Sequence, residues 1–263
     1  MNAERVTNHI VEWLKNYAIQ AKVKGFVIGV SGGIDSALTS TLCAKTDLPT
    51  LCLEMPIHQA DSQVSRALNH VQWLKKTYSN VSMTKVDLTP VFDSLVMTFP
   101  DVENEEDRYM PLANSRARLR MTSLYYFAAL NGYLVVGTGN KVEDFGVGFY
   151  TKYGDGGVDL SPIADLLKTE VYELAKYLNI NGDILVAPPT DGLWGDDRTD
   201  EDQIGASYPE LEWAMQKSDK GKSANDFTGR EREVFEIYNR LHLANKHKMV
   251  EIPICPVPEN IKN

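Results

Sequence analysis

The sequence predicts a doubly wound α/β fold, in which helices cover both faces of a mostly parallel sheet. Short apolar runs alternate with longer amphipathic segments, which is the pattern of repeated β-α units. The apolar runs at 25–30 and 133–137 carry almost no polar residue, as expected of strands that are buried on both faces. The length of 263 residues suits one large domain or two small ones and is ample for a sizeable core.

The expected elements follow one another along the whole chain. Strands are expected at 25–30, 49–55, 81–88 and 133–137. Helices are expected at about 4–22, 34–46, 60–77, 90–98, 112–131, 168–178, 208–217 and 228–245. The helix at 112–131 carries an apolar stripe at helical spacing, formed by Ala117, Met121, Leu124 and Ala128. The segment 182–207 is rich in Gly and Pro, and we expect a long loop there that acts as a mobile lid.

Composition and charge exclude several classes of protein. The chain has 27 Lys and Arg against 36 Asp and Glu, and this net charge of −9 disfavours tight nonspecific binding to nucleic acid. No apolar run approaches the roughly 20 residues that span a bilayer, and the N-terminus does not read as a signal peptide. Cys43, Cys52 and Cys255 form no C-x-x-C pair, which favours a reducing compartment and no metal cage. We therefore expect a cytoplasmic enzyme or binding protein with a small ligand, and neither a membrane nor a nucleic-acid partner.

A phosphate-binding loop is predicted between the strand at 25–30 and the helix at 34–46. Its residues are Gly29, Val30, Ser31, Gly32, Gly33, Ile34, Asp35 and Ser36. The paired glycines let the backbone approach a ligand closely, while the two hydroxyls and the first N–H groups of the helix can bind phosphate. Asp35 would repel that phosphate unless a divalent cation lay between them, so we expect Mg²⁺. The strand–loop–helix context disfavours the alternative, a Gly-Gly turn whose Asp merely caps the helix.

This loop is neither a Walker A motif nor a G-x-G-x-x-G fingerprint, and it resembles the pyrophosphate loop of the ATP pyrophosphatase superfamily. Further motifs follow at 114–121, 137–143, 151–159, 162–168, 189–190 and 247–248. Taken together they are similar to the NAD synthetase family, and the run Lys-Tyr-Gly-Asp-Gly-Gly with its trailing Asp is particularly specific to it. The resemblance runs from the first helix to about residue 250. It implies an adenine nucleotide alpha hydrolase-like fold, a single synthetase domain over 1–263, and a homodimer whose interface shapes the dinucleotide site.

The resemblance also implies roles for individual residues. Those for ATP, besides the phosphate loop, are Thr138, Lys168 and Thr190. Those for deamido-NAD (nicotinic acid adenine dinucleotide) are Arg118, Lys152, Asp159, His247 and Lys248. Glu143 would join Asp35 on Mg²⁺, and the catalytic residues would be Lys168 and Asp155, which lies nearest the reacting carbonyl and positions or deprotonates ammonia. Because Arg116 and Arg120 share a different helix face from Arg118, we expect those two to form structural ion pairs.

The implied reaction is the ATP-dependent amidation of deamido-NAD to NAD with ammonia. The carboxylate attacks the α-phosphate to give an acyl adenylate and pyrophosphate, and ammonia then displaces AMP. The chain begins within a few residues of the first expected helix, so no attached amidotransferase domain is expected, and free ammonia or a separate partner supplies the nitrogen. Ile34 replaces a Gln of many relatives, and the segment before Thr151 is about one residue longer than in some, so no contacts are assigned to 144–150.

Two other functions stay open. The first is a tRNA-modifying enzyme with the same ATP chemistry, which the acidic charge and the lack of a cysteine pair disfavour. The second is a non-catalytic nucleotide-binding protein, which would not need the acid pair of Asp35 and Glu143.

Overall fold

The computed structural model describes residues 1–59, 61–188 and 199–262, and it confirms the α/β class with a parallel sheet. The strands that it describes are β1 (Gly25–Gly29), β2 (Thr50–Glu54), β3 (Val81–Lys85) and β4 (Tyr133–Val135). Their order in the sheet is β3–β2–β1–β4, and every neighbouring pair is parallel. A parallel bridge between Val136 and Leu160 extends this pattern just beyond β4.

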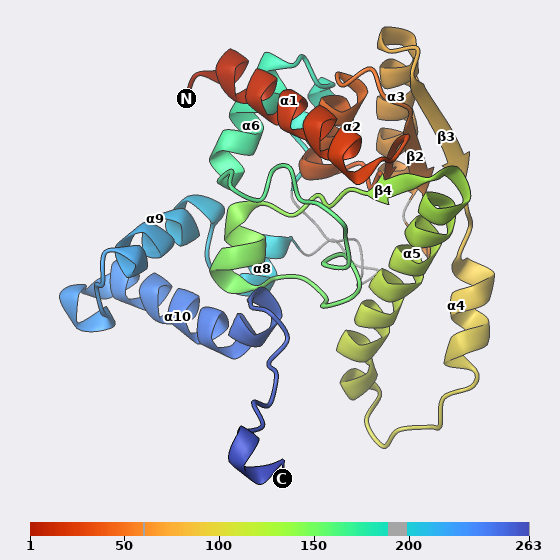
Figure 1. Ribbon diagram of the computed structural model, residues 1–263. Coiled ribbons are helices and arrows are strands. Elements are labelled where there is room, and N and C mark those ends of the chain that lie inside the picture. Colours follow the sequence, from red (N-terminus) through yellow and green to blue (C-terminus); the bar gives the residue numbers. More distant parts are fainter. Residues whose placement is uncertain (60, 189–198, 263) are drawn as a thin grey trace.

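Helices cover both faces of this sheet. Those packed near it are α1 (Ala3–Ala21), α2 (Ile34–Ala44), α3 (Asp61–Thr77), α4 (Thr89–Val96), α5 (Tyr109–Asn131) and α6 (Lys168–Tyr177). Phe26 and Ile28 of β1 pack with α1, α2 and α6, whereas Val27 points to the other face and packs with α4 and α5. Figure 1 shows α4 and α5 on the opposite side of the sheet from α1, α2, α3 and α6. The strands and helices predicted from the sequence are therefore present, with ends shifted by a few residues.

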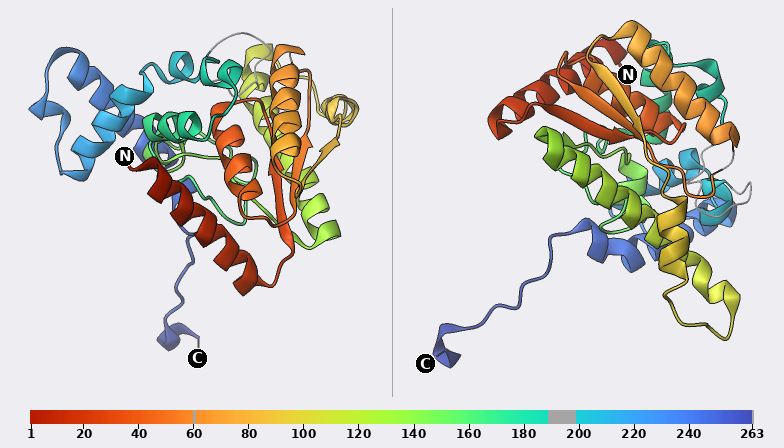
Figure 2. Two further views of the ribbon diagram at one scale, coloured as in Figure 1. Left: turned by 90° about the horizontal axis from the view of Figure 1, so that it is seen from above. Right: turned by 90° about the vertical axis from the view of Figure 1, so that its right-hand side faces the viewer.

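A second group of helices lies beside the sheet layers. It contains α9 (Tyr208–Asp219) and α10 (Gly229–Met249), which lie side by side away from the sheet (Figures 1 and 2). Phe235 and Tyr238 of α10 pack on Val142 and Val147 of η2 (Val142–Val147), a π-helical turn. Because η2 follows β4 almost directly, this packing fixes one wall of the crevice at the end of the sheet.

The segment expected to be one long loop is partly helical. Helices α7 (Gly182–Leu185) and α8 (Asp200–Ile204) occupy its two ends, so the expectation of an unbroken loop is wrong there. The start of α8 has a local cause, a capping box in which Thr199 and Asp202 each accept a hydrogen bond from the other's backbone N–H. Residues 189–198 lie outside the described residues, so the mobile lid stays a prediction.

The remaining helical turns are short, and the chain ends in an extended segment. These turns are η1 (Glu105–Arg108), η3 (Ala224–Asp226) and η4 (Glu259–Ile261). After α10 the chain runs outward from the body of the molecule (Figure 2). Within the described ranges, no helix combines the length and the apolar character that crossing a membrane requires.

Candidate active site

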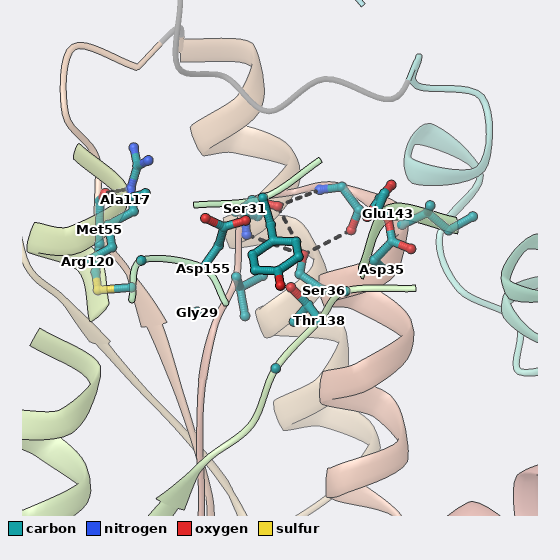
Figure 3. Close-up of a pocket in the computed structure, with 18 of the residues that line it drawn as sticks. Gly29, Ser31, Asp35, Ser36, Met55, Ala117, Arg120, Thr138, Glu143 and Asp155 are labelled. Atoms are coloured by element: carbon teal, nitrogen blue, oxygen red, sulfur yellow. Dashed lines mark hydrogen bonds between the residues drawn. The ribbon is translucent and has the colours of Figure 1, made fainter. Parts of the chain in front are cut away.

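A cavity of about 270 Å³ opens at the carboxyl ends of the parallel strands. From β1 the chain continues to β2 and β3 on one side and later returns to β4 on the other side. Open α/β sheets bind their ligands at such a switch point, outside the carboxyl ends of the strands. The phosphate loop, α5, η2 and the first residue of α6 all contribute to the lining, and Figure 3 shows part of it.

The predicted phosphate loop is held in shape by its own hydrogen bonds. The N–H of Gly33 donates to Ser31 Oγ at 3.2 Å, and the N–H of Ser31 donates to Ser36 Oγ at 3.3 Å. Ser36 Oγ in turn donates to the carbonyl of Gly33 at 3.0 Å. Helix α2 begins at Ile34, so its first N–H groups face the cavity. All of the predicted loop residues except Gly32 line the cavity.

Gly32 lies against the backbone of α3, and its replacement tests how closely α3 packs on the loop. Its φ is +83°, and a Cβ there would lie 2.7 Å from the carbonyl oxygen of Gln63 and 3.0 Å from the N of Ala67. We expect Gly32→Ala to lower the free energy of unfolding by about 1–3 kcal/mol, because a strained backbone and a backbone clash add up. Urea unfolding measures this. Gly182→Ala is the matched control, since nothing lies within 4 Å of that Cβ; equal losses in both variants would contradict the prediction.

A buried cluster of opposite charges lies beside the loop. Lys168, the first residue of α6, is only 3% exposed, and its Nζ donates to Asp35 Oδ2 at 2.6 Å and to Glu143 Oε1 at 3.0 Å. Asn140 Nδ2 donates to Asp35 Oδ1 at 3.2 Å, and Tyr208 donates to Glu143 Oε1 at 2.5 Å. The structure therefore brings together three predicted site residues that stand far apart in the sequence, and Figure 3 shows Asp35 and Glu143 side by side.

Electrostatics act differently on the three groups of this cluster. Burial, together with the charge of Glu143, raises the pKa of Asp35 above its ordinary value, although Lys168 and Asn140 oppose this. Burial disfavours an ammonium ion, but the carboxylates of Asp35 and Glu143 outweigh it and raise the pKa of Lys168 above its ordinary value. Burial likewise disfavours a carboxylate, yet Lys168 and the hydrogen bond from Tyr208 hold the pKa of Glu143 below its ordinary value. Lys168 therefore pairs with the charged form of Glu143, while Asp35 takes up a proton more readily than an ordinary carboxyl group does.

This donor set fits a divalent cation. Oxygens of Asp35 and Glu143 already converge on one cationic atom, and carboxylate oxygens are the ligands that Mg²⁺ prefers. In the part of the chain that the structure describes, no group of three or more His, Cys, Asp or Glu side chains could cage a metal. A divalent cation bound here would therefore need further oxygen ligands, such as phosphate oxygens and water.

Two more carboxyl groups lie along the wall of the cavity. Asp155 Oδ1 accepts from the N–H of Thr151 at 2.9 Å, and burial raises the pKa of Asp155 to about 6. Asp144 of η2 lies nearby, and burial together with the charges of neighbouring carboxylates raises its pKa to about 8. Both side chains line the main cavity and a second cavity of about 140 Å³. Both carboxyl groups therefore have pKa values above their ordinary range at the wall of the cavity.

Sequence reasoning did not find Asp144, because no contacts could be assigned to 144–150. The π-helical turn η2 covers most of this segment. A π turn is the usual way in which a helix absorbs one additional residue, and such turns are frequent at functional sites. The expected extra residue was thus the available signal for an altered backbone next to Glu143.

Four of the five residues predicted for deamido-NAD lie near one another. Arg118 Nη2 donates to the carbonyl of Lys152 at 3.4 Å, and Lys152 Nζ donates to the carbonyl of His247 at 3.0 Å. Lys248 Nζ donates to the carbonyl of Tyr150 at 2.6 Å, and Lys248 lines the second cavity. The structure thus brings Arg118, Lys152 and His247 together, and Lys248 follows His247 directly in α10.

The other predicted residues have separate positions. Asp159 lies beside β4, where its carboxylate accepts from the N–H of Val135 at 2.8 Å and from the hydroxyl of Tyr125 at 3.0 Å. Thr138 lines the main cavity. Thr190 lies outside the described residues, so its predicted contact with ATP is not tested.

Arg120 was assigned only a structural role from the sequence, yet it lines the main cavity. Its Nε donates to the carbonyl of Met55 at 3.0 Å, and its Nη2 donates to Gln59 Oε1 at 2.8 Å. Arg116 lies elsewhere, with its guanidinium 4.3 Å from the centre of the Phe92 ring. The available signal was the apolar stripe of the same helix, since Arg120 directly precedes Met121, which also lines the cavity.

Comparison with known proteins gives consistent matches. The family model described as NAD synthase matches residues 6–251. The chain is 36% identical over 236 residues to the NH(3)-dependent NAD(+) synthetase of Carboxydothermus hydrogenoformans, covering 88% of this chain and 92% of that protein. It is 35% identical over 265 residues to the protein of the same name from Syntrophomonas wolfei, covering 100% of both.

Solved structures agree with these relatives. NMN synthetase from Francisella tularensis superimposes with a TM-score of 0.82 at 30% identity, covering 98% of this chain and 99% of that one. NH3-dependent NAD synthetase from Campylobacter jejuni superimposes with a TM-score of 0.77 at 25% identity, covering 97% and 100%.

Proposed function

This chain belongs to the NAD synthase family, and we propose how its residues carry out the reaction of that family. The enzyme is a carbon–nitrogen ligase that joins ammonia to the nicotinate carboxylate of deamido-NAD, with ATP as co-substrate. The observation that carries the assignment of its residues is the contact of Lys168 with Asp35 and Glu143 beside the phosphate loop. We further propose that the 263 residues form one synthetase domain.

The first half-reaction makes a leaving group out of a carboxylate oxygen. That oxygen attacks the α-phosphorus of ATP, the bond to the β-phosphate breaks, and pyrophosphate leaves. We propose that Ser31, Ser36 and the first N–H groups of α2 bind the phosphates, together with Thr138, which lies beside Ser36 (Figure 3). Lys168 would move its hydrogen bonds toward the departing phosphates, where negative charge develops. Asp35 and Glu143 would hold Mg²⁺, which when bound neutralises charge on the phosphate oxygens.

The second half-reaction uses ammonia, which must first lose the proton that it carries as ammonium. We propose that Asp155 accepts this proton, because its carboxylate reaches the cavity and its N–H contact with Thr151 fixes its direction. Ammonia then attacks the acyl carbon, the bond to AMP breaks, and the amide forms. General base assistance of this kind typically accelerates a reaction by about 10²–10⁴-fold.

Asp155→Asn should separate the two half-reactions. We expect pyrophosphate release in a single turnover to persist, while NAD formation slows by about 10²-fold or more, because the amide cannot accept the proton. Since the pKa of Asp155 is raised to about 6, the amidation rate of the unaltered enzyme should fall as the pH drops below about 6. The variant depends on free ammonia instead, so its amidation rate should fall steadily with pH over the whole range, without the additional break near pH 6. Rapid-quench measurement of both products across pH tests this, and an unchanged amidation rate would remove Asp155 from the reaction.

The overall activity is tested by following pyrophosphate, AMP and NAD with deamido-NAD, ATP and Mg²⁺. NAD should form with ammonia and not with glutamine. Nicotinate mononucleotide belongs in the same assay, because the Francisella structure is titled an NMN synthetase. Binding of bulk tRNA without these products would instead favour a tRNA-modifying enzyme, and nucleotide binding without turnover would favour a non-catalytic protein.

We also propose a homodimer and a cytoplasmic location. Large apolar side chains exposed on α5, such as Tyr126 at 63% and Leu130 at 66%, support an interface on that helix. The free thiols of Cys43 and Cys52 are buried and support a reducing compartment. Light scattering after gel filtration tests the dimer, and a monomeric mass would refute it.

For the binding of deamido-NAD we propose Arg118, Lys152, Asp159, His247 and Lys248. For the phosphates of ATP we also propose Thr190.

A further inference from the structure

Glu54, the last residue of β2, is a buried acid without a hydrogen bond. It is 4% exposed, and neither of its carboxylate oxygens has a hydrogen-bond partner. Lys85, opposite it on β3, compensates the charge from 3.6 Å, a distance too long for a hydrogen bond. Leaving a buried polar group without a partner is costly, and native proteins rarely do so without a functional reason.

The carboxylate belongs to the wall of the main cavity. Glu54 lines that cavity together with its neighbours Leu53 and Met55 and with Gln63 and Val64 from the first turns of α3. Leu53, Met55 and Val64 have no group that could donate a hydrogen bond to it, and the amide of Gln63, which could, makes no hydrogen bond with it. A ligand in the cavity can therefore supply the missing donors.

The position of Glu54 indicates which part of a ligand it meets. β2 is the direct neighbour of β1, which leads into the phosphate loop, and adjacent strands lie about 4.8 Å apart. Figure 3 shows Asp35 and Glu143 toward one end of the cavity and Met55 with Arg120 toward the other. Asp155 and Lys248 connect the site to the second cavity. Phosphates bound at the loop thus leave the β2 end for the nucleoside to which they are attached.

We propose that the Glu54 carboxylate accepts hydrogen bonds from the nucleoside of ATP and makes the enzyme selective for it. This inference rests on the proposed function, because it takes the phosphates of ATP to lie at the loop. A carboxylate only accepts hydrogen bonds, and its two oxygens match two donors: the neighbouring hydroxyls of ribose or the amino group of adenine. Both sources offer the same chemistry, and nucleotides that lack one or the other distinguish them.

The test compares Glu54→Gln with the unaltered enzyme on ATP, 2′-deoxy-ATP, 3′-deoxy-ATP and ITP. The amide turns one acceptor into a donor, and loss of a charged hydrogen bond should raise the KM for ATP by about 10- to 100-fold. The preference for ATP over the deoxynucleotides should collapse if ribose is the donor. The preference over ITP should collapse instead if adenine is the donor. Calorimetric titration with a non-hydrolysable ATP analogue, without deamido-NAD, reports the same loss as binding alone.

Lys85→Gln is the matched control for a purely structural role. If Glu54 served only as the partner of Lys85, both variants would lose stability alike and keep the nucleotide preference of the unaltered enzyme. That outcome, or a Glu54→Gln enzyme with unchanged KM and unchanged preferences, overturns the inference. If the Glu54→Gln variant does not fold, Glu54→Asp replaces it in the test, because it keeps the charge. The shorter Asp side chain should also weaken ATP binding. Failure of the proposed function is separate, since the unaltered enzyme would then make no NAD.

Discussion

Asp35→Asn should abolish adenylation while leaving the fold intact, with pyrophosphate release slower by about 10³-fold or more. The carboxylate of Asp35 accepts a 2.6 Å hydrogen bond from Lys168 and lies in the phosphate loop itself. An amide there offers a weak, neutral ligand for a divalent cation and removes the charge that pairs with Lys168. Both changes act on the step in which negative charge moves onto pyrophosphate.

The measurement is pyrophosphate release with saturating deamido-NAD and a titration of Mg²⁺. We expect the variant to need far more Mg²⁺ and to stay slow at saturation. Asp165→Asn is the matched control, because Asp165 is 96% exposed and pairs with Lys141 at the surface. That control should retain full activity. Near-normal pyrophosphate release by Asp35→Asn, with unchanged dependence on Mg²⁺, would show that the cation is held elsewhere.

The parts of the site that follow one another in the chain could be predicted from the sequence. The loop from Gly29 to Ser36 could be predicted from its own residues and from the buried strand and the helix on either side of it. The same local logic placed Thr138 after β4. Strand and helix positions followed from apolar spacing, which reports burial directly.

Contacts between distant segments could not be derived in this way. Spacing says nothing of whether Lys168 meets Asp35 and Glu143 or forms a surface ion pair, and the family resemblance alone proposed their shared site. The hydrogen bond from Tyr208 to Glu143 depends on how α9 packs against η2. No sequence pattern fixes that packing.

Residues that break the expected local rule were missed altogether. Glu54 ends a strand that otherwise reads as buried, so its acid resembles an ordinary exposed strand end until its 4% exposure is known. Asp144 lies in a π turn, for which the helical spacing of 3.6 residues gives the wrong face. Arg120 borders an apolar stripe that indicates core, although part of that stripe faces the cavity.

Lys168→Met should be the most damaging single substitution for both stability and activity. Removing one partner of a buried ion pair leaves uncompensated charge, which typically costs about 3–5 kcal/mol. Here the cost falls on two carboxylates at once, Asp35 and Glu143, although water in the cavity screens part of it. Adenylation should also stop, because the cation that meets the departing phosphates is gone.

The stability loss should depend on pH in a definite direction. In the unaltered enzyme the folded-state pKa of Glu143 lies below its ordinary value of 4.5, so its contribution is present above that pH and is lost as the pH falls. The pKa of Lys168 lies above its ordinary value of 10.5, so its contribution is fully present below that pH. The difference in unfolding free energy between the two proteins should therefore be largest between about pH 5 and 10 and should shrink in acid.

Urea unfolding of both proteins at several pH values measures this difference. Lys141→Met is the matched control, because it removes a lysine from the exposed pair with Asp165 and should cost at most about 1 kcal/mol at any pH. A loss in Lys168→Met that is small, or that stays constant down to pH 3, would mean that this lysine does not hold Glu143 in its charged form. In that case the contacts of Lys168 would explain neither the stability of this site nor its chemistry.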